Sequence, residues 1–325
     1  MTIVKPRDTE LILRVARLYY EKGQSQDQVA RAMGTSRSNI SRMLSDAKRM
    51  GFVQIKIVAP ITRHDSLSYQ LKKALGVGEV QVVGTDRSET TLTSVGRAAA
   101  MALTRALQPN MTIAISWGRG VEATIVETQN ETVPGLRVTQ LMGGLASISS
   151  SVSAEELGRT LAQNLHAQFV PLLSPAVVSN SKTRNTLLNE SSIAQVLEIS
   201  RESNIALVGI GSRGSPSSED VLRQFNLNKT LYNLVARNYA GDISARFYDS
   251  QGRAVSAEMD NRVVGLTLEE IADIPLVIGV AAGGEKALGV LGAARAGLID
   301  SLVTDVACAT EILKLITPAK AVRSA

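Results

Sequence analysis

Two patterns of hydrophobic and polar residues follow one another along the chain, and the change falls near residue 60. Before that point, apolar residues recur on the spacing of amphipathic helices, among many polar and basic residues. After it, short aliphatic runs alternate with longer helix-like segments, which is typical of an α/β sheet. We therefore expect a small helical domain over residues 1–60 and a larger α/β domain over residues 61–325.

Three helices are predicted in the first domain. The first covers residues 8–20. The second follows Ser25, which has a glutamine three residues after it, the spacing of a capping box. Gly34 ends this helix and supplies the left-handed residue that a sharp turn needs. Ser36 then caps a third helix, which is apolar on one side and ends at Gly51.

This order of elements is the layout of a helix-turn-helix, with the small Ala30 where its two helices cross and Ile40 anchoring the second. The outward face at the start of the third helix is polar and basic, and such side chains reach base edges and phosphates. Residues 52–60 alternate in hydrophobicity, which predicts a β wing along the DNA backbone. We predict that double-stranded DNA is contacted by Thr35, Ser36, Arg37, Ser38, Asn39, Ser41, Arg42 and Lys56. The alternative is a helical bundle that serves only dimerisation.

The distribution of charge favours a polyanionic partner for the first domain. Residues 1–60 hold eleven Lys and Arg against five Asp and Glu, a net charge of +6, whereas the whole chain carries +5. The rest of the chain is therefore nearly neutral, so the excess of positive charge belongs to the head alone. Basic residues that only face solvent would give the same count.

Seven aliphatic runs predict the strands of the larger domain. Because these runs are almost entirely apolar and alternate with helical segments, they indicate a parallel sheet that is covered on both faces. The runs are 79–84, 112–118, 137–144, 169–173, 205–211, 276–284 and 301–305. The helical segments between them include 88–107, 119–128, 154–166, 285–296 and 305–316.

Glycine-rich loops follow four of these runs, at the strand ends where open α/β sheets bind ligands. They are SWGRG (116–120), MGGLASISS (142–150), GIGSRG (209–214) and AAGGEK (281–286). Glycines let backbone N–H groups approach a ligand, and a helix that begins after such a loop favours phosphate. These loops also carry hydroxyls and cations, on Ser147, Ser149, Ser150, Arg119, Arg213 and Lys286. Together they predict a pocket for a small phosphorylated molecule, although each glycine turn alone has a steric explanation.

Candidate catalytic chemistry is confined to Asp242, in GDISARFYDSQG (241–252). Its carboxylate is suited to act as a general base or as an acceptor for a sugar hydroxyl, and it is equally suited to cap a turn. The sequence shows no Ser–His–Asp or Cys–His pairing and no pair of carboxylates typical of glycosidases. GIGSRG has the spacing of GxGxxG, but Ser-Pro-Ser-Ser follows it, so we do not expect a dinucleotide site. Two histidines with one cysteine form no metal site, so we expect neither cofactor nor metal.

The chain resembles the SorC family of bacterial transcriptional regulators over about residues 8–316. The similarity is carried by VARLYYEKGQSQDQVARAMGTSRSNISRML, AISWGRG, LMGGLAS, LVGIGS and GDISARFYDSQG, and most specifically by the block from Val277 to Asp305. The resemblance implies a winged helix-turn-helix followed by a Rossmann-like α/β effector domain, related to the ribose-5-phosphate isomerase and glucosamine-6-phosphate deaminase fold. It also implies a homo-oligomer, typically a tetramer, that binds operator DNA near a carbohydrate-use operon and responds to a sugar phosphate or related carbohydrate.

The same resemblance implies which residues contact the effector. They are Ser116, Gly118, Arg119, Gly143, Gly144, Ser147, Asp242 and Lys286. Two positions depart from the family's pattern. Some members carry a lysine just before the double glycine, able to form a Schiff base, where this chain has Met142. Gly120 stands where relatives often have Thr or Ser, so either Arg119 compensates for the lost hydroxyl or the ligand carries less phosphate.

The remaining features concern the compartment and the rival functions. No run of eighteen apolar residues predicts a membrane span, the N-terminus lacks the layout of a signal peptide, and a single cysteine fits a reducing compartment, so we expect a cytoplasmic protein. We expect a DNA-binding regulator gated by a sugar or sugar phosphate, and not an enzyme. The rivals are a sugar-phosphate isomerase or deaminase with an appended DNA-binding head, and a body that serves only as a multimerisation scaffold.

Overall fold

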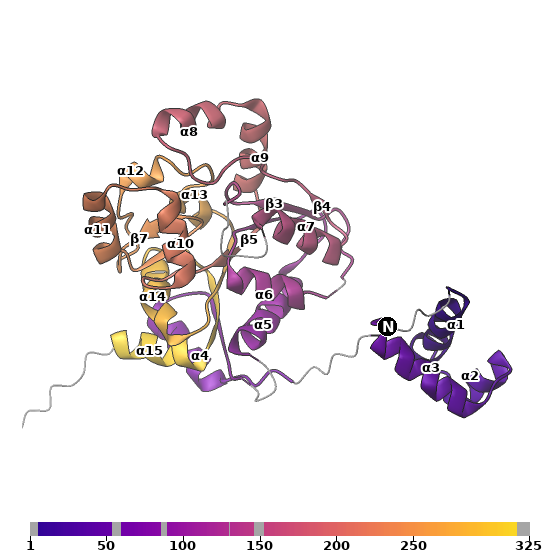
Figure 1. The fold of residues 1–325 in the computed structure, drawn as a ribbon. Coiled ribbons are helices and arrows are strands. Elements are labelled where there is room, and N and C mark those ends of the chain that lie inside the picture. Colours follow the sequence, from indigo (N-terminus) through magenta and orange to yellow (C-terminus); the bar gives the residue numbers. More distant parts are fainter. Residues whose placement is uncertain (1–5, 54–59, 86–89, 130, 146–152, 317–325) are drawn as a thin grey trace, which may run out of the picture. The chain divides into compact units, whose positions relative to one another are not determined.

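The computed structural model describes the chain except for residues 1–5, 54–59, 86–89, 130, 146–152 and 317–325 (Figure 1). The contacts divide the chain into two compact units, Met1–Pro60 and Ile61–Ala325, and each unit is described by itself. Within the described residues, every helix is too short or too polar to cross a membrane.

In its described residues, the N-terminal unit contains three α-helices and one short π-helix. They are α1 (Pro6–Ala16), η1 (Arg17–Glu21), α2 (Gln26–Met33) and α3 (Arg37–Arg49). The first predicted helix therefore continues past α1 as a turn of π-helix. Its core joins residues from all three α-helices, namely Val15, Val29, Ala30, Ile40 and Leu44.

The predicted starts of α2 and α3 and the predicted end of α2 are confirmed. Ser25 and Gln28 form a reciprocal capping box at the start of α2, and Gly34 ends that helix with φ +62°. The Ser36 hydroxyl accepts from the backbone N–H of Asn39 and so caps α3. The third helix ends two residues before the predicted Gly51, and most of the predicted wing lies outside the described residues.

A seven-stranded parallel sheet forms the centre of the C-terminal unit, as the aliphatic runs predicted. Its order is β1-β9-β8-β5-β2-β3-β4. The strands are β1 (Glu79–Val83), β2 (Thr112–Ile115), β3 (Arg137–Gln140), β4 (Gln168–Phe169), β5 (Ile205–Gly209), β8 (Leu276–Val280) and β9 (Ser301–Asp305). Several strands end before their glycines, and β4 covers only the first residue of the run predicted at 169–173.

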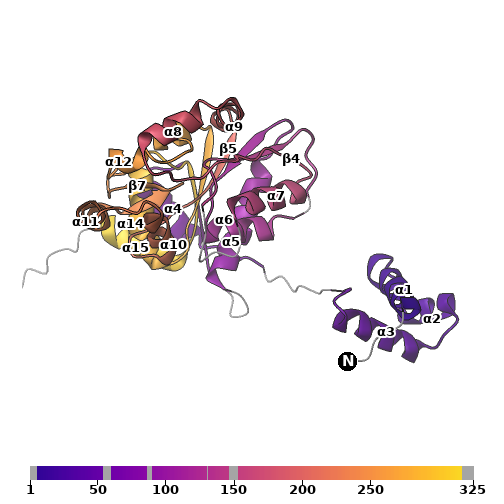
Figure 2. The same cartoon turned by 45° about the horizontal axis from the view of Figure 1, so that its top comes forward.

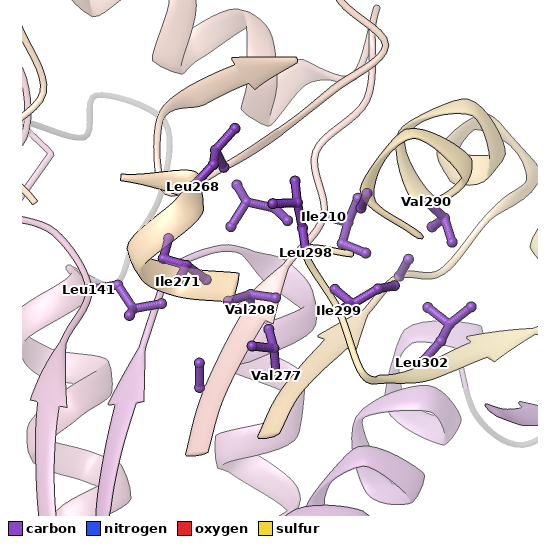
Figure 3. Packing of buried hydrophobic residues seen from close by; sticks show 14 of the residues in the cluster. Leu141, Val208, Ile210, Leu268, Ile271, Val277, Val290, Leu298, Ile299 and Leu302 are labelled. Atoms are coloured by element: carbon purple, nitrogen blue, oxygen red, sulfur yellow. The ribbon is translucent and has the colours of Figure 1, made fainter. Parts of the chain in front are cut away.

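Helices cover both faces of this sheet (Figure 2). Those on one face are α5 (Thr91–Ala106), α6 (Arg119–Glu127) and α7 (Ala154–Asn164), and those on the other include α4 (Asp65–Leu75), α9 (Ser191–Arg201), α14 (Ala287–Arg295) and α15 (Val306–Ile316). Successive residues of a strand contribute to the cores on opposite faces of the sheet. Ile205 and Leu207 belong to the core under α5, α6 and α7, and Ala206 and Val208 belong to the core on the other face. Figure 3 shows part of the core that contains Ala206 and Val208. There Val208 and Val277, which belong to strands, lie beside apolar residues from the segments that connect the strands.

A separate lobe lies between β5 and β8 in the sequence, and the hydrophobic pattern did not predict it. It contains a hairpin of β6 (Gly241–Ile243) and β7 (Arg246–Tyr248), with α10 (Pro216–Gln224), α11 (Lys229–Asn238), α12 (Ala257–Asp260) and α13 (Leu268–Ala272). Its own core joins Phe225, Tyr239 and Phe247, whose rings meet edge to face. The described part of the unit also contains α8 (Ser181–Leu188) and the short 3₁₀ helix η2 (Gly284–Lys286).

Candidate functional site

A cavity of about 350 Å³ opens where the direction of the chain through the sheet reverses. From β2 the chain continues through β3 to β4 on one side, then returns with β5 to the other side of β2. Ligands of open α/β sheets bind at such a switch point, outside the carboxyl ends of the strands. The cavity lies at that place, between residues 117–120, which follow β2 and begin α6, and residues 209–211 at the end of β5. Its volume is in the range of small-molecule sites.

The first wall of the cavity is the start of α6. Gly118 precedes this helix with φ +125°, and no side chain caps its N-terminus. The first backbone N–H groups of α6 therefore keep their capacity to bind an anion, and Arg119 adds a full positive charge beside them. Gly120 has a steric role, because a Cβ there would lie 3.1 Å from a Val280 side-chain carbon and 3.2 Å from its carbonyl oxygen.

The second wall is the loop between β8 and α14. The Asp305 carboxylate accepts from the backbone N–H of Gly283 at 2.8 Å, which fixes the loop where Gly283 adopts φ +103°. Lys286 follows and is only 7% exposed. Burial lowers the pKa of the Lys286 ammonium, while the Asp242 carboxylate acts in the opposite direction. The loop therefore brings a buried cation to the cavity.

The third wall is the hairpin that carries Asp242, which lies in β6 opposite Phe247. The structure therefore does not support the alternative that Asp242 caps a turn. Its Oδ1 accepts from Ser218 Oγ at 2.5 Å, a short bond typical of an ionised acceptor. Burial raises the pKa of the Asp242 carboxyl, while the Ser218 hydrogen bond and Lys286 oppose that rise. The backbone of Gly211 passes so close that a Cβ there would overlap the carboxylate.

The polar face of the N-terminal unit is held by hydrogen bonds along α3. Asn39 donates from Nδ2 to Thr35 Oγ1 at 2.9 Å and accepts on Oδ1 from the Arg42 guanidinium at 3.3 Å. The hydroxyls of Ser36 and Ser38 lie 2.9 Å apart. Arg37, Ser38, Ser41 and Arg42 are exposed. Lys56 lies outside the described residues.

Comparison with known proteins places the chain in a family. The model Sugar-bind, described as "Putative sugar-binding domain", matches residues 59–314. The sorbitol operon regulator of Klebsiella pneumoniae is 31% identical over 313 residues, which cover 94% of this chain and 98% of that protein. The chain belongs to the SorC family of transcriptional regulators. The deoxyribonucleoside regulator of Bacillus subtilis (strain 168) is 27% identical over 300 residues, 91% of this chain and 95% of that one.

A solved structure of the SorC family has the same fold. The crystal structure of the full-length sorbitol operon regulator SorC from Klebsiella pneumoniae aligns with a TM-score of 0.71 at 30% identity. The alignment covers 95% of this chain and all of that one. The similarity therefore extends through both units and is not limited to the α/β body.

Only some of the effector residues expected from the SorC pattern line the cavity. Gly118, Arg119, Asp242 and Lys286 do, and they come from three separate segments of the chain. Ser116 is not among the lining residues, and its hydroxyl accepts from the Gly209 N–H at 3.0 Å, which joins the residue after β2 to the end of β5. Its part in effector binding stays a prediction, while its observed contact is structural.

The double glycine and Arg213 are placed differently from the expectation. Gly143 packs against the chain at Ser174, since a Cβ on Gly143 would lie 2.3 Å from that carbonyl oxygen. Gly144 is hydrogen-bonded to the same segment, and neither glycine lines the cavity. Arg213 also lies off the cavity wall and donates to the carbonyl of Arg237 at 2.9 Å, so the prediction that it is a pocket cation was wrong. Ser147, Ser149 and Ser150 lie outside the described residues.

Several cavity residues were not predicted from the sequence. They include Thr91, Trp117, Ser217, Ser218, Ser244 and Asp305. Ser218 joins several groups of the site, because its hydroxyl also accepts from Ser215 Oγ at 3.0 Å and from the Ser212 N–H at 3.1 Å. The signal available in the sequence was Ser-Pro-Ser-Ser after GIGSRG, which is typical of a helix start. The start of α10 then brings Ser218 to Asp242.

Proposed function

We propose that the chain regulates transcription of a carbohydrate-use operon by binding operator DNA through its N-terminal unit and a sugar phosphate or related carbohydrate through its C-terminal unit. The observation that carries this proposal is the composition of the cavity. Backbone donors and Arg119 gather at one wall, and a buried carboxylate with its hydroxyl partner lies at another. A phosphorylated polyol has an anion at one end and hydroxyls along the rest, so it complements both walls.

The phosphate is proposed to bind at the start of α6. An anion there accepts from several backbone N–H groups at once and faces the positive end of the helix dipole. Arg119 can pair with two phosphate oxygens, and its exposed position leaves it mobile enough to close over the ligand. These features compensate for the hydroxyl that Gly120 lacks.

The sugar hydroxyls are proposed to bind at the other end, beside Asp242 and Lys286. An ionised carboxylate only accepts hydrogen bonds and an ammonium only donates them, so the two groups fix the orientation of neighbouring hydroxyls. Both lie in a site of low solvent access, where a hydrogen bond left unmade is costly. Ligands that lack the matching hydroxyl are therefore rejected.

The N-terminal unit is proposed to read DNA with the exposed side chains of α3. Arg37 and Arg42 are long enough to reach base edges or phosphates, and the bond to Asn39 limits the orientations of Arg42. The names of the relatives, a sorbitol operon regulator and a deoxyribonucleoside regulator, support this role. We propose a homo-oligomer, with a tetramer as the expected state, in which the effector changes the spacing of paired recognition helices.

A titration tests the effector half of the proposal. Trp117 is the only tryptophan of the chain and lines the cavity, so its fluorescence reports binding directly. We expect at least one sugar phosphate from a panel of pentose and hexose phosphates to change this fluorescence and to alter operator binding. Arg119→Ala should weaken the phosphorylated ligand about tenfold or more and change the affinity of the free sugar far less. No response to any sugar, phosphorylated or free, would contradict the proposal.

A mobility-shift assay tests the DNA half, with duplexes selected from a random library by the full chain. Arg42→Ala should weaken the selected duplex by about 1–3 kcal/mol and relax specificity at one base pair. Arg49→Ala is the matched control, since it removes the same charge from the far end of α3. Equal losses in both variants, with specificity retained, would show that only total charge matters.

An enzymatic role is the second candidate, because a buried carboxyl with a raised pKa beside a buried lysine with a lowered pKa is an arrangement common in active sites. We favour the regulator without turnover, since Asp242 is already committed to Ser218. Incubation of purified protein with pentose and amino-sugar phosphates decides between them. Multiple turnover that Asp242→Asn abolishes would favour the enzyme.

A further inference from the structure

One hydroxyl of the cavity, that of Ser244, has no hydrogen-bond partner among the described residues. Ser244 is 2% exposed, its Oγ is buried, and it forms part of the cavity wall. Buried hydroxyls almost always find a partner, because leaving one unpaired costs the hydration that it lost. The unpaired Oγ therefore requires a reason, and its position on the cavity wall supplies one.

The backbone at Ser244 is also strained. Ser244 and Ala245 form the two-residue loop between β6 and β7, with φ +51° and +62°. A hairpin loop with two positive φ angles is normally built from Asn and Gly, since side chains disfavour this region. This chain places a serine and an alanine there instead. Strain of this kind is found most often at functional sites.

Ser244 lies on the same cavity as Asp242. It follows that residue by two positions, at the first residue of the loop after β6, and both residues line the cavity wall. Asp242 in its ionised form only accepts hydrogen bonds, whereas a serine hydroxyl both donates and accepts. The pair therefore complements two oxygens on different carbon atoms of one ligand.

Ser212 shows that an unpaired buried serine is not by itself a ligand contact. Its Oγ is also buried without a partner among the described residues, and the residue is 1% exposed, but it does not line the cavity. It belongs to the neighbouring loop after β5. Ser212 therefore offers a control of the same chemistry, burial and neighbourhood.

We propose that Ser244 determines the sugar specificity of the cavity by hydrogen bonding, through Oγ, a hydroxyl or carbonyl oxygen of the bound sugar phosphate next to the hydroxyl held by Asp242. This inference rests on the proposed function, because it names the part of the same ligand that Ser244 recognises. The inference predicts that a sugar phosphate lacking this one oxygen binds more weakly, because Ser244 Oγ then has no partner. The missing partner of Ser244 is then supplied by the ligand.

Calorimetric titration of the full chain tests the inference. The probes are ribose 5-phosphate, glucose 6-phosphate and fructose 6-phosphate, followed by the single-deoxy analogues of whichever binds. Ser244→Ala should weaken the parent compound about tenfold, equal to about 1.4 kcal/mol, and Ser212→Ala should change its affinity less than about twofold. The wild type should bind one of the deoxy analogues about tenfold more weakly than the parent compound. Ser244→Ala should bind that analogue as well as it binds the parent compound, because the hydrogen bond is already missing.

The stability of the unliganded variants separates recognition from a structural role. Ser244→Ala removes an unpaired buried hydroxyl, and Ser244→Gly also relieves the positive φ, so both should melt at or above the temperature of the wild type. Weaker binding together with equal or higher melting temperature supports the proposal. Unchanged affinity of Ser244→Ala, or equal losses in Ser244→Ala and Ser212→Ala, overturns it while the proposed function stands. If the wild type binds none of the probes, the proposed function fails and this inference fails with it.

Discussion

Ser218→Ala is the most informative single change in the pocket, because one hydroxyl holds three separate groups. Ser218 Oγ donates to Asp242 Oδ1 at 2.5 Å and accepts from Ser215 Oγ at 3.0 Å and from the Ser212 N–H at 3.1 Å. Ser218 is 1% exposed, so no bulk water replaces these bonds in the variant. The substitution leaves the methylene of the side chain in place and removes only the oxygen.

The expected loss of stability follows from these three bonds. Each neutral bond contributes about 0.5–1.5 kcal/mol net, and the bond to the carboxylate contributes about 1.5–3 kcal/mol. Some relaxation around the small cavity reduces the sum, so we expect the free energy of unfolding to fall by about 3 kcal/mol. For a unit of this size the melting temperature should fall by roughly 6–12 °C.

The loss should also depend on pH, with a sign that the structure fixes. The folded-state pKa of Asp242 is raised above 3.8 by burial, and the Ser218 hydrogen bond opposes that rise. Removing Ser218 raises the pKa further. A carboxyl with a raised folded pKa stabilises the fold below its unfolded pKa and loses that effect as pH rises through the folded pKa. The destabilisation by Ser218→Ala is therefore smaller near pH 4 than near pH 8.

Urea denaturation followed by the fluorescence of Trp117 measures this effect within the C-terminal unit. Ser217→Ala is the matched control, since Ser217 lines the same cavity and its side chain makes no hydrogen bond to another described residue. We expect the control to stay within about 0.5 kcal/mol of the wild type. The reasoning is refuted if Ser218→Ala is no worse than Ser217→Ala, or if its penalty is the same at pH 4 and pH 8.

Three further substitutions test other parts of the site. Asp242→Asn removes the carboxyl whose pKa is raised by burial. In urea titrations the variant should therefore have the same unfolding free energy as the wild type near pH 4 and a higher one toward pH 8. A difference that is constant with pH contradicts this. Asp305→Ala leaves the Gly283 N–H without its acceptor and should lower the free energy of unfolding by about 1–3 kcal/mol in thermal unfolding. It should also weaken sugar phosphate binding in calorimetry. Unchanged binding would show that the loop between β8 and α14 needs no support from Asp305. Arg246→Met removes three hydrogen bonds to backbone carbonyls, among them the bond of 2.6 Å to Leu266. The free energy of unfolding should fall by about 3–5 kcal/mol in chemical denaturation. A fall below about 1 kcal/mol argues against a stabilising role of this buried arginine.

The sequence allowed correct prediction of those elements whose determinants are local. The capping box at Ser25, the left-handed Gly34 and the cap at Ser36 each involve residues at most four apart, and the structure has all three. The strands were found because a parallel sheet buried on both faces requires continuous aliphatic runs. The lobe between β5 and β8 was missed because its helices are short or polar, such as α12 with four residues and α11, in which Val235 alone is buried.

The cavity wall was predictable where a glycine borders the cavity and unpredictable where a glycine packs against the chain. Gly118 and Gly143 both follow a strand, and both looked like ligand loops in the sequence. Gly118 has open space around its Cα, whereas Gly143 is required because a carbonyl passes directly over it. Ser218 was missed for a related reason, since its partner Asp242 lies 24 residues away and only the folded lobe joins them.

The polar groups of the pocket lower the stability of the unit that carries them, and this links recognition to stability. Asp242 keeps a buried carboxylate, Lys286 a buried ammonium, and Ser244 an unpaired hydroxyl on a strained turn. Each of these groups is penalised in the free protein, and in the proposed complex each would gain a partner from the sugar phosphate. A ligand that binds only the folded state adds stability as RT ln(1 + [L]/Kd), about 2.7 kcal/mol at one hundred times Kd. Variants that stabilise the free chain at these positions should therefore bind more weakly, and this inverse relation distinguishes ligand-binding polar groups from those, such as Arg246, whose partners lie within the fold.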